Sequence, residues 1–392
     1  MNKDILNTGT QDFINNNLTT DTMSVLLKDH GFEGVTSKEI VQQIEAKNKC
    51  KEKLPTWFKT PLIYYPEKLH IEQTSSEATA QYKAEISSGK SLLDVTGGLG
   101  VDSYYFSLRI DRVIHSEINP KLAEIAAYNF KVLGRDNIKT LTTDGLEFLK
   151  NSDSHFDWIY VDPSRRNNVK GKVFMLADCL PNVPENLDLL FASAKNIMIK
   201  TAPLLDISAG ILELRSVKEI HVVALKNEVK ELLWILERGC QGEIEIKTVN
   251  LTSTERETFN FKLNNEAIAS PGYSDPQSYL YEPNSAILKS GAFKTIAESF
   301  GVNKLHEHSH LYTNNQLLDF PGRRFTIEGV FPYHKKAISS LDISKANITT
   351  RNFPVSVSDI RKKFKIKDGG TTYLFFTTDM HGNKIVLNCA KV

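Results

Sequence analysis

Acidic residues and glycines recur at the ends of short apolar runs in the middle of the chain. The run LLDVTGGLG places Asp94 ahead of Gly97, Gly98 and Gly100. Glycines at such a junction let backbone N–H groups approach a ligand closely, because they lack a Cβ and tolerate unusual dihedral angles. The next β-rich run ends in Glu117, twenty residues after Gly97. A carboxylate at that separation suits a ribose diol, since it accepts hydrogen bonds from both hydroxyls.

Two further acidic residues follow the next two apolar runs. Asp144 stands in TTDGLEF, where it could accept a hydrogen bond from an adenine amino group or cap the helix that follows. Asp162 and Pro163 end the run WIYVDPSRR, at the place where a substrate would meet a cofactor, although an Asp-Pro pair also starts turns. Each carboxylate alone has a structural explanation. Four of them in order, each after a β-rich run, indicate one ligand site.

Two arginines follow the Asp-Pro pair closely. Arg165 and Arg166 could hold a phosphate through bidentate hydrogen bonds. Alternatively, they bridge to Asp94 or Asp102, or lie in a solvated loop. Their place beside the substrate end of the predicted site favours a functional role.

The elements that would carry these side chains alternate between strands and helices. Within roughly 71–250, β-rich runs such as SLLDV, RVIHSE and FDWIYVD are separated by helical patterns such as PKLAEIAAYNFKVLG. That alternation predicts an α/β domain with a parallel, doubly wound sheet, in which ligands bind at the carboxyl ends of the strands. Residues 1–70 show three- and four-residue apolar spacing, which predicts a mainly helical accessory domain. Residues 251–392 contain turn signals and a terminal hairpin around Asp379 to Asn383, so we expect an α+β domain there.

Composition narrows the function classes only in part. A chain of 392 residues exceeds one ordinary core, and its hydrophobic content of 41% and charged content of 24% are typical of a soluble globular protein. The net charge of +1 means that nucleic-acid binding would have to come from local patches. Four cysteines without a CxxC pair suggest neither a zinc knuckle nor a disulfide framework, and they favour reduced thiols in the cytoplasm. We expect no signal peptide, membrane span or metal site.

The ordered motifs resemble those of class I S-adenosylmethionine-dependent methyltransferases. LLDVTGGLG is similar to the glycine motif of that family, and the resemblance covers roughly 71–240. It implies a Rossmann-like sheet and S-adenosylmethionine as cofactor. It also implies cofactor contacts from the acidic residues and the glycine loop, namely Asp94, Thr96, Gly97, Gly98, Gly100, Glu117, Asp144 and Asp162.

The substrate side of the resemblance departs from the family pattern. Many amino-group methyltransferases have two prolines and an aromatic residue after the Asp or Asn, whereas this chain has Asp162-Pro163-Ser164-Arg165-Arg166. No aromatic residue is available there to stack on a target base, so the methylated atom stays open. The resemblance implies Asp162 and Pro163 as catalytic residues. We add Arg165 to them because of its position beside the predicted point of methyl transfer, where Arg165 and Arg166 would also contact the substrate.

A segment before the glycine motif adds a second resemblance. EQTSSEATAQYKAEI is similar to the helix that precedes the glycine motif in RNA cap trimethylguanosine synthases and related RNA methyltransferases. There the segment covers cofactor and substrate, which implies substrate contacts from Gln73, Thr79 and Lys83. The alternative is an amphipathic helix that only covers the sheet.

The C-terminal block is basic in places. GRRF, YHKKA and DIRKKFKIKDGG interleave basic residues with Phe325, Tyr333 and Phe364, a pattern that suits phosphates and bases, although surface helices carry such lysines routinely. YLYEPNSAILKSG and ANITTRNFPVSVSDIRKKFKIKDGG resemble the THUMP-like domain joined to some bacterial methyltransferases. THUMP domains bind tRNA, so the resemblance implies an RNA partner.

Together these observations predict a cytoplasmic S-adenosylmethionine-dependent methyltransferase that acts on a tRNA or rRNA base. Its chemistry would require the acceptor about 3 Å from the methyl group, in line with the methyl–sulfur bond, with Asp162 orienting an acceptor amine. We interpret Cys179 as a small buried apolar residue rather than a nucleophile. The alternatives are a protein or small-molecule methyltransferase, a non-catalytic RNA-binding protein, and a nicotinamide oxidoreductase, against which Asp94 and Asp162 argue. The sequence does not predict the oligomeric state.

Overall fold

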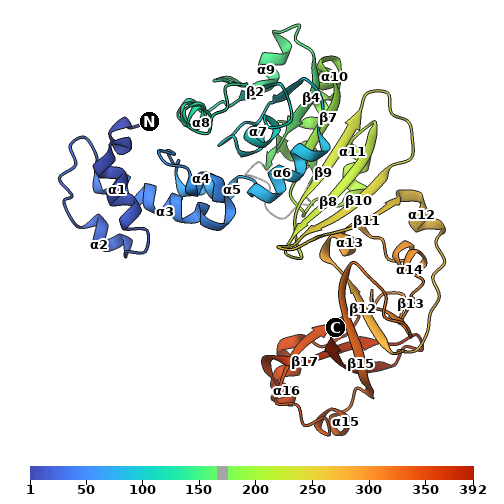
Figure 1. Ribbon diagram of the computed structural model, residues 1–392. Coiled ribbons are helices and arrows are strands. Elements are labelled where there is room, and N and C mark those ends of the chain that lie inside the picture. Colours follow the sequence, from blue (N-terminus) through green and yellow to red (C-terminus); the bar gives the residue numbers. More distant parts are fainter. Residues whose placement is uncertain (166–174) are drawn as a thin grey trace. The chain divides into compact units, whose positions relative to one another are not determined.

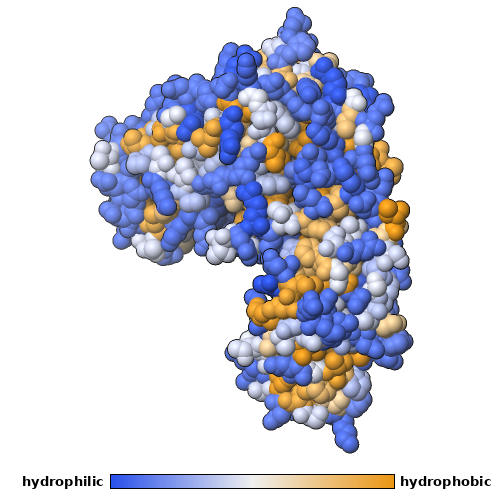
Figure 2. Space-filling view, turned by 45° about the vertical axis from the view of Figure 1, so that its right-hand side comes forward, coloured by the Kyte–Doolittle hydropathy of each residue, from blue (hydrophilic) through white to orange (hydrophobic). Residues whose placement is uncertain are grey.

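A computed structural model describes residues 1–165 and 175–392, with Arg165 described by its backbone alone (Figure 1). The chain forms two compact units. The first holds residues 1–217 and 233–241, and the second holds 218–232 and 242–392. Hydrophilic side chains cover most of the face shown in Figure 2, with smaller hydrophobic patches between them. None of the helices in the described ranges has the length and apolar character needed to cross a membrane.

The first unit begins with short helices. The longest, α3 (Ser37–Lys53), starts after Thr36, whose side chain and that of Glu39 each accept a hydrogen bond from the other residue's backbone. This reciprocal cap satisfies two N–H groups that the helix itself leaves without partners. The other elements before the sheet are η1 (Lys3–Leu6), α1 (Thr8–Asn16), α2 (Thr22–Leu26), α4 (Pro55–Lys59), α5 (Lys68–Gln73) and α6 (Glu77–Ile86).

Parallel strands form the centre of the first unit, in the order β7-β4-β1-β2-β3. Each pair of neighbours in this series is parallel, as strand–helix alternation requires. This arrangement confirms the predicted parallel α/β sheet. The strands are β1 (Ser91–Asp94), β2 (Arg112–Ser116), β3 (Ile138–Leu141), β4 (Phe156–Val161) and β7 (Ala194–Thr201). The elements between and after them are α7 (Val101–Phe106), α8 (Pro120–Val132), α9 (Gly145–Lys150), β5 (Ser164–Arg165), η2 (Leu176–Asp178), β6 (Cys179–Leu180), α10 (Val183–Ser193) and α11 (Ile207–Glu213).

Strand register brings the functional candidates to one edge of this sheet. Asp94 pairs with His115 on β2 and with Tyr160 on β4. Val161 pairs with Ile199 on β7, so the residues that follow these two also lie side by side. Because all five strands run in the same direction, their carboxyl ends share this edge.

One hydrophobic cluster joins the N-terminal helices to the sheet. It contains Ile44 and Trp57 from the helices together with Phe106, Phe130 and Tyr160 from the α/β part. The helical region and the sheet therefore share one core within the first unit. The subdivision into a helical domain 1–70 and a methyltransferase domain 71–250 stays a proposal, as does a separate domain 251–392.

The second unit contains two sets of strands. β10 (Glu245–Leu251) pairs in parallel with β8 (Val217–Leu225) and antiparallel with β11 (Arg256–Lys262), while β8 and β9 (Glu228–Glu237) contribute residues to both units. The other set is a seven-stranded sheet in the order β13-β14-β12-β15-β18-β17-β16. Its strands are β12 (Tyr279–Pro283), β13 (Asn303–Lys304), β14 (Tyr312–Asn314), β15 (Gly322–Pro332), β16 (Lys345–Thr350), β17 (Lys367–Thr378) and β18 (Lys384–Lys391). The helices of this unit are α12 (Leu263–Ile268), α13 (Ser285–Ser290), α14 (Thr295–Phe300), α15 (Lys335–Ser339) and α16 (Val357–Phe364).

The chain ends in the predicted hairpin. β17 and β18 pair antiparallel, and the Asp379 carboxylate accepts hydrogen bonds from the backbone N–H groups of His381 and Asn383. Separate clusters of buried residues around Phe325 and Phe376 stabilise this sheet. Helices and antiparallel strands in this region confirm the predicted α+β character.

Asn129 provides a test of how strongly the linker before α5 is held to α8. Its buried side chain accepts a hydrogen bond from the Tyr64 N–H (3.0 Å) and donates one to the Tyr64 carbonyl (2.9 Å). Asn129→Ala leaves both backbone groups buried without partners, so we expect a loss of about 2–4 kcal/mol in the free energy of unfolding. All three tryptophans lie in the first unit, so urea unfolding followed by tryptophan fluorescence measures it. Asn48→Ala, at an exposed side chain, is the control, and equal effects of the two substitutions would contradict the prediction.

Candidate active site

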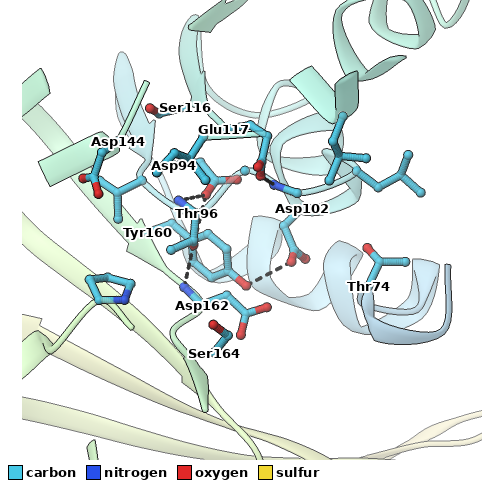
Figure 3. Close-up of a pocket in the computed structure, with 18 of the residues that line it drawn as sticks. Thr74, Asp94, Thr96, Asp102, Ser116, Glu117, Asp144, Tyr160, Asp162 and Ser164 are labelled. Atoms are coloured by element: carbon cyan, nitrogen blue, oxygen red, sulfur yellow. Dashed lines mark hydrogen bonds between the residues drawn. The ribbon is translucent and has the colours of Figure 1, made fainter. Parts of the chain in front are cut away.

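A cavity of about 530 Å³ lies at the carboxyl ends of β1 to β4 (Figure 3). Carboxylates reach it from the segments after all four strands. Gln73 and Thr74, at the end of α5, form another part of its wall, and Leu180 and Pro181 complete it. The remaining lining residues are His70, Asp94, Val95, Thr96, Gly97, Gly98, Leu99, Val101, Asp102, Ser116, Glu117, Ile118, Leu122, Thr143, Asp144, Gly145, Leu146, Tyr160, Asp162 and Ser164.

The glycine loop is shaped by a buried histidine. A Cβ at Gly97 would lie 2.3 Å from the His115 ring, and one at Gly100 would lie 2.3 Å from the Phe130 ring. Gly100 also has a φ of 84°, in the left-handed region that favours glycine. Glycine is therefore required at these two positions because side chains from β2 and α8 fill the space beneath the loop. Sequence reasoning missed His115, whose only signal is a polar residue inside the apolar run RVIHSE.

Asp94 connects the loop to the strand below it. One carboxylate oxygen accepts a hydrogen bond from the Thr96 N–H (3.0 Å), and the other accepts one from the Ser103 hydroxyl (2.6 Å). The Ser103 oxygen also lies 2.9 Å from Nδ1 of His115. Burial raises the pKa of Asp94 to about 7, and burial lowers the pKa of His115 to about 3. The histidine is therefore neutral at physiological pH.

On the β2 and β3 side of the cavity, two carboxylates are held by backbone groups. Glu117, labelled in Figure 3, accepts hydrogen bonds from the backbone N–H groups of Gly98 and Asn119, each at 2.7 Å. Asp144 caps α9 through one oxygen, which accepts from Leu146 N–H and Glu147 N–H. The cap and the ligand explanations for Asp144 are compatible, because its other oxygen accepts no hydrogen bond from a described residue.

Two apolar side chains at the cavity escaped sequence reasoning. Ile118 directly follows Glu117 and is 70% exposed, and Leu180 is 54% exposed. Apolar side chains that line a cavity are able to pack against the apolar part of a ligand, such as a flat ring.

On the β4 side, Asp162 is held from two directions. Its backbone N–H donates to the Thr96 hydroxyl (2.7 Å), and its carboxylate accepts from the Lys200 ammonium (2.5 Å). Lys200 lies on β7 beside Asp162, and sequence reasoning did not identify it. Pro163 is buried, while Ser164 lines the cavity.

Beneath this side lies a buried ion pair. The Lys83 ammonium on α6 is 3.2 Å from the Asp102 carboxylate, which also accepts from the hydroxyls of Ser75 (2.8 Å) and Tyr160 (2.9 Å). Burial would raise the pKa of Asp102, but the ammonium groups of Lys83 and Lys200 and these hydrogen bonds lower it below its usual value. Asp102 is therefore a carboxylate at neutral pH.

The predicted residues thus separate into groups. Thr79 and Lys83 are buried and do not line the cavity, because Thr79 bonds back to Ser76 and Lys83 pairs with Asp102. The predicted contact of these two side chains with the substrate therefore receives no support from their positions.

Other predicted residues differ in how they are placed. Arg165 is described only as a backbone residue of β5, and Arg166 lies outside the described residues. Cys179 is fully buried, as predicted. Predicted residues that do line the cavity are Gln73, Asp94, Thr96, Gly97, Gly98, Glu117, Asp144 and Asp162.

Within the described residues, no group of three or more His, Cys, Asp or Glu side chains is arranged to hold a metal ion. The arrangement instead offers carboxylates, a close backbone approach at the glycine loop and apolar walls. Such a site accommodates an elongated ligand that carries positive charge, hydroxyl groups and a ring.

The clash at Gly97 can be separated from simple backbone strain. We expect Gly97→Ala to destabilise the first unit by about 1–3 kcal/mol through overpacking against His115. Gly98→Ala meets no atom closer than 3.9 Å, but its φ of 58° costs roughly 1–2 kcal/mol. His115→Ala should therefore rescue Gly97→Ala but leave the penalty of Gly98→Ala in place. Urea unfolding of the three single variants and of the two double variants with His115→Ala measures this, and rescue of both glycine substitutions would contradict the steric explanation.

The neutral His115 also predicts a pH dependence. Its folded-state pKa of about 3 lies below the ordinary value of 6.5, so its contribution to stability is complete above pH 6.5 and is lost as pH falls toward 3. His115→Leu removes this loss. As the pH falls from 7.5 to 5, the original protein should therefore lose about 2 kcal/mol of unfolding free energy that the His115→Leu variant keeps. Equal pH profiles for the two proteins would show that His115 titrates normally.

Comparisons with known proteins identify the family of this chain. A family model described as a ferredoxin-like domain matches residues 279–321, and one described as THUMP domain-like matches 322–391. A solved structure from Porphyromonas gingivalis W83, described as a "putative methyltransferase", is 32% identical, with a TM-score of 0.89, covering 100% of this chain and 98% of that one. An S-adenosylmethionine-dependent methyltransferase of Mycobacterium tuberculosis, described as uncharacterised, is 21% identical over 310 residues, covering 76% of this chain and 80% of the relative. A tRNA (guanine(26)-N(2))-dimethyltransferase of Methanosphaera stadtmanae is 26% identical over 108 residues, 27% of this chain and 28% of the relative.

The relationship to the Porphyromonas gingivalis protein spans both units, and the relatives' names match the cofactor that the strand-end motifs predict. The chain belongs to the class I S-adenosylmethionine-dependent methyltransferases that carry a C-terminal THUMP-like domain.

Proposed function

We propose that this methyltransferase acts on RNA, a tRNA or an rRNA. The observation that carries the proposal is the charge of one stretch in the THUMP-like domain. Residues 333–367 contain nine Lys or Arg and two Asp, a net charge of +7 in a chain whose total is +1. Concentrated positive charge attracts the phosphate backbone of a nucleic acid. The relative from Methanosphaera stadtmanae, which is named for a tRNA substrate, supports the same class.

The basic stretch presents its charge to solvent. Its exposed lysines surround α15 and α16, and Lys363 lies 4.8 Å from the centre of the Tyr333 ring and donates to its hydroxyl (3.2 Å). The exposed members are Lys335, Lys336, Lys345, Lys362, Lys363, Lys365 and Lys367. Seven cations on one short stretch suit contact with several phosphates.

Other predicted RNA contacts in this domain need revision. Phe325 was a predicted base contact, but it is fully buried in the core with Phe375 and cannot stack on a base. Arg323 pairs with the buried Glu282, and Arg324 pairs with Asp319. The proposed RNA surface is therefore the stretch 333–367 rather than the GRRF segment.

The residues of the cavity fit S-adenosylmethionine. Its sulfonium and amino groups are positive, and several carboxylates meet at the cavity. We assign Glu117 to the ribose hydroxyls and Asp144 to the adenine amino group, with Ile118 and Leu180 against the ring. We assign the methionine part to the space beside Asp94 and Gly98, since a Cβ at Gly98 would meet no protein atom closer than 3.9 Å.

When bound, the cofactor supplies a methyl group already activated by the positive sulfur. The protein then has to place an acceptor in line with the methyl–sulfur bond and exclude water. We assign the orienting role to Asp162, whose backbone is fixed by Thr96. Pro163 stiffens the chain after it, and we keep Arg165 as a proposed substrate contact.

The assignment of Glu117 is tested by binding. Glu117→Ala should weaken the binding of S-adenosylhomocysteine by about 1–3 kcal/mol, because charged hydrogen bonds to the ribose are lost. Isothermal calorimetry measures this. Glu147→Ala, at an exposed residue of α9 that does not line the cavity, is the control and should leave the affinity unchanged. An unchanged affinity of Glu117→Ala would remove Glu117 from the cofactor site.

The RNA proposal is tested by transfer of tritium from labelled S-adenosylmethionine into total RNA from a strain that lacks the gene. We expect label in that RNA and none in RNA from the parent strain, whose sites are already methylated. Lys362→Glu with Lys363→Glu should lower RNA affinity and flatten its salt dependence by about two in the log–log slope. Lys28→Glu with Lys38→Glu, at exposed lysines of the first unit, is the matched control. Cofactor binding without label in RNA would redirect the search to protein or small-molecule acceptors.

A further inference from the structure

We infer that Lys200 is a positioning residue that holds Asp162 so that one carboxylate oxygen takes a proton from an uncharged amino group of the acceptor. This inference rests on the proposed transfer of a methyl group beside Asp162. It adds to the proposed function a residue outside the recognised motifs and a chemical class for the methylated group.

The geometry gives Lys200 this role. The pairing of Val161 with Ile199 sets Lys200 beside Asp162, and the ammonium contacts Oδ2 of the carboxylate. Thr96 holds the backbone N–H of Asp162. Asp162 lines the cavity, whereas Lys200 does not, and the lysine side chain is only 15% exposed. Lys200 therefore acts through the carboxylate, whose Oδ1 accepts no hydrogen bond from a described residue.

The distribution of charge favours an uncharged acceptor. On the β4 side, two carboxylates each have an ammonium partner, in the pairs Asp102–Lys83 and Asp162–Lys200. On the other side, Glu117 and Asp144 also line the cavity, and neither forms an ion pair with a described residue. They lie where the ribose and the adenine of the cofactor are proposed to bind. Lys200 offsets the charge of Asp162, and it would repel a cationic acceptor such as a lysine ammonium.

The chemistry of the step favours nitrogen. The lone pair of the amino nitrogen attacks the methyl carbon, the carbon–sulfur bond breaks, and its electron pair stays on sulfur, which becomes a neutral thioether. The nitrogen is now positive and strongly acidic, so its proton passes to Oδ1 of Asp162 and later to water. A carboxylate paired with a lysine is a weak base, which suffices for this proton but not for activating a ribose hydroxyl.

A ring carbon is a poor candidate for another reason. Methylation of an unactivated pyrimidine carbon needs a nucleophile that first adds to the ring. No cysteine is among the described residues that line the cavity, and Cys179 is fully buried. Among ribose hydroxyls, ring carbons and amino groups attached to a base, the arrangement favours the amino group, as in guanine, adenine or cytosine, which is uncharged at neutral pH.

The class of acceptor is tested by digesting the tritium-labelled RNA to nucleosides and separating them. Label in an amino-methylated nucleoside supports the inference. Label on a ribose oxygen, on a ring carbon or on a protein lysine overturns it, and in the first two cases the RNA proposal stands. Label in an uncharged amino group of a small molecule would overturn the RNA proposal and support this inference.

The role of Lys200 is tested by Lys200→Met and Lys200→Arg, with Lys195→Met as the matched control. Lys195 lies on the same strand, but its side chain is 70% exposed and pairs with Glu237. We expect Lys200→Met to lower kcat roughly 10- to 100-fold, with unchanged affinity for S-adenosylhomocysteine, and Lys200→Arg to restore most of the rate because it keeps the charge. A full rate for Lys200→Met overturns the positioning role, as does loss of cofactor affinity in step with kcat. If Lys200→Met does not fold, the rate of Lys200→Arg still tests the positioning role, and the identity of the labelled nucleoside still tests the class of acceptor.

Discussion

The crowding of carboxylates at one edge of a parallel sheet is the constraint on which this site depends. Parallel strands bring their carboxyl ends together, so motifs that are far apart in sequence place like charges within one small cavity. The protein resolves the repulsion in two ways. Burial raises the pKa of Asp94 to about 7, so this carboxyl group is partly protonated at neutral pH. Asp102 and Asp162 instead receive ammonium partners from Lys83 and Lys200. The helix α6 and the strand β7, which carry these lysines, are therefore as necessary to the site as the glycine loop.

A second constraint is steric, and it acts beneath the loop. His115 and Phe130 fill the volume that side chains at Gly97 and Gly100 would occupy. A charged histidine in that position would be a buried cation beneath the glycine loop. Burial keeps the ring neutral and so avoids this unfavourable charge. The same side chain thus sets the path of the loop and keeps its surroundings free of positive charge.

Local patterns and long-range packing account for what could and could not be predicted from the sequence. The strands, the parallel order and the strand-end residues Asp94, Glu117 and Asp162 follow from local periodicity and from the rule that such ends meet. The partners His115 and Lys200 were not predictable, because strand register decides which side chains lie next to a motif. Lys83 was predicted to reach the substrate, but its burial depends on the packing of α6, which the sequence pattern does not contain.

The C-terminal part shows the same limit. Its terminal hairpin followed from turn residues, whereas Phe325 was misjudged, since its place in the core depends on a sheet assembled from distant strands. The charges at the cavity and those of the stretch 333–367 can nevertheless be explained in the same way. At the cavity of the first unit, Asp102 and Asp162 have ammonium partners, whereas Glu117 and Asp144 form no ion pair with a described residue. On the stretch 333–367 of the second unit, cations outnumber anions, and this local excess of charge suits the proposed RNA substrate. A chain of nearly zero net charge can therefore combine a cavity for a cationic cofactor with a surface for the proposed anionic substrate, because each attraction is local.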